Sequence, residues 1–174
     1  GLSRQASLRR LLGSADVSKE RFEELADRKN GYYQECLKSL TEDGVLPGVR
    51  HLLDGLAEMG LKLAVVSLSC NARTVLLRTG VMDAFDIIID GRDLVRVRSS
   101  LNRYLRAAGI LGVEPGRCVV VEDSTAGIAA SRTAGMRSVG VGDPDRLCAA
   151  TLAFESLRGV QAATLVQWLA EGRP

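Results

Sequence analysis

The sequence predicts an α/β fold: a Rossmann-like parallel sheet with helices on both faces, preceded by a small helical unit. From about residue 45 onward, short apolar segments alternate with amphipathic helical segments, a pattern typical of parallel sheets. The 174 residues are 46% hydrophobic and 25% charged, which suits one domain or a core with a small appendage. No apolar run approaches the ~18–20 residues that span a bilayer.

The first 43 residues predict helices. Ser18 has the position and side chain of an N-cap, and apolar residues follow it at helical spacing. Gly31 lies inside this second helix, costs about 1 kcal/mol relative to Ala and allows a kink. The turn residues Asp43 and Gly44 mark a boundary. Residues 1–43 are therefore expected to form a partial helical cap and residues 44–174 the α/β core.

Five strands and five helices are expected in the core. The strands are expected at residues 61–66, 85–90, 118–121, 138–141 and 151–154, and the helices at 48–60, 71–78, 100–108, 124–134 and 160–170.

Polar residues follow two of these strands. Ser67, Ser69 and Asn71 come after the first, where hydroxyls and free N–H groups at a helix start can bind an anion. Glu122 and Asp123 come after the third, and adjacent carboxylates there are costly unless a cation or hydrogen-bond donors hold them. Each motif alone is also compatible with simple helix capping. Since ligands bind beyond the carboxyl ends of parallel strands, the two together predict a site for Mg²⁺ and phosphate.

The same segments resemble a known family. Leu61–Ser69 and Val119–Ile128 are similar to motifs of the haloacid dehalogenase superfamily, in its β-phosphoglucomutase-like branch. Gly1–Arg4, Leu25–Asn30 and Val139–Gly142 resemble that branch too. The resemblance covers nearly the whole chain and implies the family's core fold with a helical cap.

The resemblance also implies roles for individual residues. It implies that Ser67 binds the transferring phosphoryl group, that Ser69 and Asn71 support it, and that Glu122 and Asp123 bind Mg²⁺. In place of the family's phosphate-binding Lys stands Arg98, which keeps the charge but lacks the flanking prolines. Arg4 and Lys29 match cap residues that hold the distal phosphate and sugar, which favours a mutase.

One family motif is missing. The family's nucleophile and general acid/base lie in an Asp-x-Asp-Gly motif that follows a central first strand. This sequence contains no such motif and no strand that matches this first one. The chain itself is therefore expected to hold no catalytic residue. Without the central strand, the strands ending at Ser67 and Glu122 are expected to face each other with unpaired edges. They could close on each other, or accept a strand from another chain, or accept a segment not included in this sequence; the last is favoured.

Three functions remain open. The first is Mg²⁺-dependent phosphoryl transfer resembling β-phosphoglucomutase, from β-glucose 1-phosphate to glucose 6-phosphate, with this chain alone inactive. The second is a sugar-phosphate phosphatase, and the third a non-catalytic binding or regulatory relic of the fold. The expected partner is a phosphorylated sugar; the identity of the sugar and the oligomeric state are left open.

The low net charge favours neither nucleic acid nor membrane as a partner. The net charge is only +2, and the arginines around the expected helix at 100–108 have a single aromatic neighbour, so a solvated face is expected. These arginines are Arg92, Arg96, Arg98, Arg103 and Arg106. The four cysteines are widely spaced, which is typical of reduced thiols and favours a cytoplasmic location.

Overall fold

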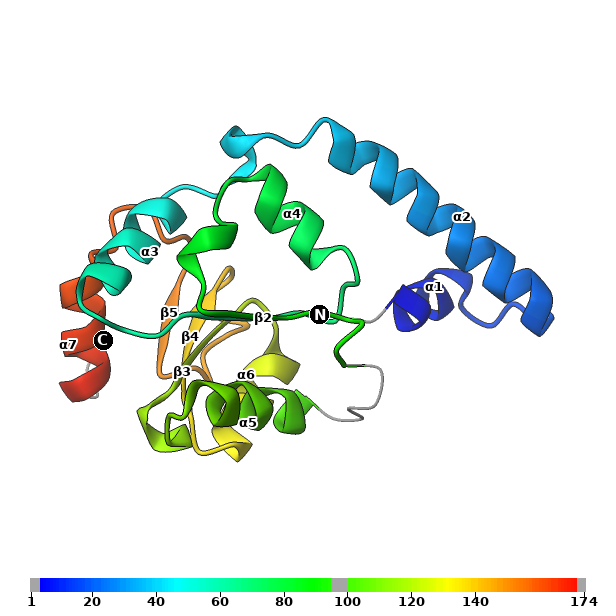
Figure 1. The fold of residues 1–174 in the computed structure, drawn as a ribbon. Helices are drawn as coiled ribbons and strands as arrows, with labels where there is room; N and C mark the ends of the chain where they lie inside the picture. The colour runs from blue at the N-terminus through cyan, green and yellow to red at the C-terminus, as the bar shows by residue number, and fades with distance from the viewer. Residues whose placement is uncertain (1–3, 95–99, 172–174) are drawn as a thin grey trace.

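A computed structural model describes residues 4–94 and 100–171, and it confirms the α/β class with parallel strands (Figure 1). The helices are α1 (Arg4–Leu12), α2 (Lys19–Lys38), α3 (Val49–Glu58), α4 (Ala72–Arg78), α5 (Ser100–Leu111), α6 (Thr125–Thr133) and α7 (Ala162–Glu171). The strands are β1 (Ala64–Val66), β2 (Ile87–Ile89), β3 (Val119–Glu122), β4 (Arg137–Val141) and β5 (Leu152–Phe154). Short 3₁₀ turns lie at Glu42–Gly44, Met82–Ala84 and Pro115–Arg117.

Helices α1 and α2 form an arm that reaches away from the strands (Figure 1). Ser18 caps α2 as predicted, since its hydroxyl accepts the Arg21 N–H at 3.2 Å. Helix α2 continues through Gly31 as one element. The arm has a small core of its own, in which Leu8 packs with Phe22. The boundary after residue 43 stays a prediction.

All strand pairs are parallel, and their positions agree closely with the expected segments. β1 pairs with β2 from Ala64 opposite Ile87 to Val66 opposite Ile89. β1 is shorter than expected because Leu61 is 43% exposed and its N–H donates back to the Leu56 carbonyl, so that residue belongs to the turn after α3.

The strands form two sheets rather than one. One sheet has the order β1-β2 and the other β3-β4-β5, and within the described residues β1 and β3 do not pair with each other. Val119 and Val121 of β3 are 42% and 52% exposed, although they belong to an apolar strand. Of the three arrangements considered above, direct closure of these two strands is therefore not the one found.

The two open edges share a covering layer of helices. Val66 of β1 and Val120 of β3 pack against one cluster that includes Tyr104 of α5 and Ala130 of α6. On the other side, Leu52 of α3 packs with β4, β5 and α7. Figure 1 shows α5 and α6 on one side of the strands and α3 and α4 on the other. Both edges thus belong to one layer with helices on both faces, as the sequence predicted.

Candidate functional site

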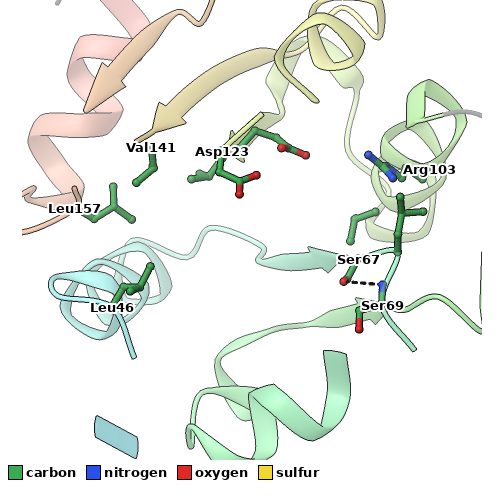
Figure 2. A pocket seen from close by; sticks show the side chains of 11 residues that line it. Leu46, Ser67, Ser69, Arg103, Asp123, Val141 and Leu157 are labelled. Carbon is green, nitrogen blue, oxygen red and sulfur yellow. Dashed lines mark hydrogen bonds between the residues drawn. The ribbon is translucent and has the colours of Figure 1, made fainter. Parts of the chain in front are cut away.

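A cleft of about 550 Å³ lies at the carboxyl ends of β1 and β3, where the two sheets face each other (Figure 2). Its apolar wall includes Leu46, Val121, Val141 and Leu157. Its polar lining comprises Ser67, Ser69, Arg103, Glu122 and Asp123. Four of the residues predicted from the sequence are therefore brought together: the two serines and the two carboxylates.

The loop after β1 that contains Ser67 and Ser69, here called the serine loop, is stabilised by hydrogen bonds from its own backbone N–H groups. Ser67 Oγ accepts the Ser69 N–H at 3.1 Å, and Ser69 Oγ accepts the Asn71 N–H at 3.1 Å. Gly91, after β2, donates its N–H to the Ser69 carbonyl at 3.1 Å, and a Cβ at Gly91 would lie 2.5 Å from the Leu68 carbonyl oxygen. Because both serine oxygens act as acceptors here, each hydroxyl proton stays available for an anion in the cleft.

Asn71 does not line the cleft. Its Nδ2 donates to Asn30 Oδ1 of α2 at 3.0 Å, so this side chain ties the arm to the loop after β1. It makes no side-chain capping bond to α4. The predicted phosphate-binding role of Asn71 stays a prediction, and the structure adds a positioning contact to it.

Two other predicted substrate residues, Arg4 and Lys29, lie outside the cleft lining. Arg4 pairs with Asp27 across the two arm helices, and Lys29 lies half-buried on α2. Arg98 lies outside the described residues. Contact between these residues and a substrate stays a prediction.

Glu122 is held from two sides by donors of the chain. The Tyr104 hydroxyl donates to Oε1, and the Ser124 hydroxyl donates to Oε2 at 2.9 Å. Burial, and next the Glu122 carboxylate, raise the pKa of Tyr104 to about 12. A Cβ at Gly127 in the first turn of α6 would lie 2.1 Å from Glu122 Cδ, so only glycine allows this approach.

Asp123 carries the carboxylate that faces the cleft (Figure 2). A carboxylate oxygen is the ligand type that Mg²⁺ prefers. Glu122 could join it through an oxygen that also accepts a hydrogen bond, since Tyr104 donates to Oε1 and Ser124 donates to Oε2. Among the residues that the structure describes, no three His, Cys, Asp or Glu side chains group as a metal site. The fit to Mg²⁺ is therefore partial and depends chiefly on Asp123.

Arg103 was wrongly assigned to a solvated face. It is only 8% exposed and lines the cleft, whereas Arg92 and Arg106 are exposed as predicted. Arg96 and Arg98 lie outside the described residues. The signal was in the spacing: Tyr104, Ala107 and Ala108 are buried on the inner face of α5, and Arg103 lies beside them on that face.

Asp90, a buried carboxylate that sequence reasoning missed, stabilises the turn at the end of β2. Asp90 is 1% exposed and accepts the Arg92 N–H at 2.8 Å, and Arg73 Nε lies 3.4 Å from its Oδ2. The Arg92 guanidinium donates to the Cys70 carbonyl at 2.8 Å. The hydrogen bond from the Asp90 N–H, partly opposed by burial, lowers the pKa of Asp93. This network holds the end of β2 beside the serine loop. In the sequence, only the turn residues Asp90 and Gly91 indicated that this strand ends in a specific local structure.

These features place the chain in a family. It belongs to the haloacid dehalogenase-like hydrolases, whose family model matches residues 4–135. Within that family it falls in the β-phosphoglucomutase-like branch.

Individual relatives support this assignment. The chain is 37% identical over 156 residues to the β-phosphoglucomutase of Bacillus subtilis strain 168, covering 87% of this chain and 69% of that protein. It is 33% identical over 129 residues to hexitol phosphatase B of Escherichia coli O157:H7, covering 70% of this chain and 58% of that protein. A crystal structure of β-phosphoglucomutase from Clostridium difficile matches with a TM-score of 0.90 and 32% identity, covering 98% of this chain and 78% of that one.

Among the described residues, no helix is both long enough and apolar enough to cross a membrane.

Proposed function

We propose that this chain forms part of a Mg²⁺-dependent sugar-phosphate phosphotransferase that converts β-glucose 1-phosphate to glucose 6-phosphate. The observation that carries the proposal is the cleft in which Ser67, Ser69 and Asp123 meet at the carboxyl ends of β1 and β3, two strands that do not pair with each other within the described residues. Hydroxyl donors beside a carboxylate suit a phosphate with its cation. The similarity to β-phosphoglucomutases supplies the substrate class.

Each side chain then has a task. The Ser67 and Ser69 hydroxyls donate hydrogen bonds to oxygens of the transferring phosphoryl group. Asp123, with Glu122 through Oε2, would hold Mg²⁺, which neutralises phosphoryl charge when bound. Tyr104 fixes the Glu122 carboxylate by its hydrogen bond.

The remaining predicted residues are proposed to complete the substrate site. Arg98 supplies a further positive charge to the phosphate, and Asn71 supports the loop that holds it. Arg4 and Lys29 hold the distal phosphate and the sugar.

The nucleophile is proposed to arrive on a further strand. Within the part of the chain that the structure describes, no strand pairs with the facing edges of β1 and β3. Each N–H or C=O group buried there without a partner costs about 1–3 kcal/mol. A parallel strand ending in Asp-x-Asp-Gly would satisfy both edges and bring a carboxylate to the cleft. Without that carboxylate no aspartyl-phosphate can form, so the chain alone is proposed to be inactive.

A phosphatase is the second candidate, favoured by the similarity to hexitol phosphatase B. It would use the same cleft with water as the phosphoryl acceptor. A non-catalytic relic of the fold is the remaining alternative, in which the cleft binds phosphate without turnover.

Turnover separates these functions. The 174-residue chain is compared with the same chain preceded by an apolar strand ending in Asp-x-Asp-Gly, with the Asn-x-Asn-Gly version as matched control. The substrate is β-glucose 1-phosphate with a trace of glucose bisphosphate and Mg²⁺. Glucose 6-phosphate formed only by the Asp version supports the mutase, and inorganic phosphate alone supports the phosphatase. No product from the extended chain would reject both enzymes.

A further inference from the structure

Arg103 is a buried cation in the wall of the cleft. The residue is 8% exposed, and its Nε has no hydrogen-bond partner. Figure 2 shows its guanidinium facing the cleft, on the side opposite Asp123. Because arginine keeps its proton under all ordinary conditions, this position holds a full positive charge away from water. Such a charge is unfavourable unless an anion or hydrogen-bond acceptors compensate it.

The described part of the chain compensates this charge only in part. The guanidinium carbon lies 5.3 Å from the centre of the Tyr104 ring, which gives a cation–π contact. The Arg103 side chain also interacts with the Tyr104 hydroxyl, whose pKa is raised by burial and Glu122 and lowered to a lesser degree by Arg103. None of the ion pairs found within residues 4–94 and 100–171 includes Arg103. Glu122, which also lines the cleft, already accepts from the Tyr104 and Ser124 hydroxyls. An anion in the cleft would supply the remaining negative charge that the Arg103 guanidinium needs.

The serine loop provides the complementary donors. Ser67 and Ser69 line the same cleft, and their oxygens accept backbone N–H groups, which leaves both hydroxyl protons to donate. A tetrahedral oxyanion between this loop and Arg103 would meet hydroxyl donors on one side and guanidinium donors on the other. The planar fork of arginine suits such an anion because two N–H groups can bind two of its oxygens.

We infer that Arg103 binds the phosphoryl group in this cleft and provides its buried positive charge. The inference rests on the proposed function and adds a residue to it: a binding residue on α5 in addition to the predicted Arg98. The alternative is that Arg103 only packs its stem and guanidinium against Tyr104. In that case its removal would change stability but not phosphate affinity.

Inorganic phosphate is the probe, titrated into the 174-residue chain near neutral pH at constant ionic strength. Amide and arginine Nε–H signals are followed by NMR. The Arg103 Nε–H signal should move with the same saturation curve as the amides of residues 67–71. R103M should weaken phosphate binding about tenfold or more, and R103K should weaken it less. R132M, which removes an exposed arginine from α6, is the matched control and should bind within about twofold of the original chain.

Two results would overturn the inference. One is an Arg103 Nε–H signal that does not move while the amides of residues 67–71 saturate, and this readout needs no variant to fold. The other is an R103M chain with a well-dispersed spectrum and unchanged phosphate affinity. Either result leaves the proposed function standing, since that is judged by turnover of the extended chain. If the extended chain shows no turnover but Arg103 still binds phosphate, the proposed enzymatic function is rejected and the inferred phosphate site stands.

Discussion

The hydrogen bond between Tyr104 and Glu122 offers a sharp test of how the site is held. Tyr104 is 5% exposed and donates its hydroxyl to Glu122 Oε1. The Y104F substitution keeps the ring in the α5–α6 cluster and removes only this donor, leaving Oε1 without it. A hydrogen bond to a charged group contributes about 1.5–3 kcal/mol. Y104F should therefore lower the free energy of unfolding by about that amount at neutral pH.

The raised pKa of Tyr104 predicts a second effect, a loss of stability at alkaline pH. Burial, and then Glu122, raise this pKa from 10.0 to about 12. The folded state thus holds the phenol proton more tightly than the unfolded state, so the stabilisation is complete below about pH 10 and is lost as the pH rises toward 12. The difference corresponds to roughly 2–3 kcal/mol of stability lost at alkaline pH, and because burial is its largest cause, only part of it comes from the hydrogen bond to Glu122.

Urea unfolding at neutral and alkaline pH measures both effects. Y33F is the matched control, because Tyr33 lies on α2 and is 45% exposed, and it should change stability by less than about 0.5 kcal/mol. Absorbance should show one of the three tyrosines ionising late, and Y104F should remove that late step. Equal stability of the two variants at neutral pH, or a late step that survives in Y104F, would refute the reasoning.

Further substitutions test three other features: the close approach at Gly127, the proposed metal ligand Asp123 and the hydrogen bond between Asn71 and Asn30. G127A should cost about 1–3 kcal/mol because its Cβ would overlap a carboxyl group, whereas G109A on α5, with open space around it, should gain up to about 1 kcal/mol; equal thermal shifts would contradict this. D123N should weaken Mg²⁺ binding in calorimetry while leaving urea unfolding unchanged, and unaltered binding would count against the metal site. N71A should cost about 0.5–1.5 kcal/mol, and should cost nothing further in an N30A background if the two amides act as a pair.

Local signals were sufficient for most of the fold. Ser18 could be identified as a cap because capping depends on a side chain and an N–H three residues away. The meeting of Ser67 with Asp123 followed from a topological rule, since parallel strands bring their carboxyl ends to one edge. The end of β1 was predicted correctly, but its start was placed too early because the Leu61 N–H bonds back to α3, which the hydrophobic pattern does not reveal.

Long-range contacts were beyond the sequence. The hydrogen bond from Asn71 to Asn30 joins residues 41 positions apart, and no local pattern around either residue predicts it. Arg103 was misassigned because its charge outweighed the buried spacing of its neighbours, although position 103 lies on the inner face of α5. The role of Tyr104 depends on a carboxylate 18 positions away, brought close only when α5 packs on β3.

The central claim is that the facing edges of β1 and β3 receive a further parallel strand. Deuterium exchange of the chain is measured with and without an apolar peptide ending in Asp-x-Asp-Gly, and with a scrambled peptide as control. Amides on the facing edges of β1 and β3 should become protected together, while the outer edge of β5 stays unchanged. Protection at β5 alone, or none at β1 and β3 with the peptide in excess, would contradict the account.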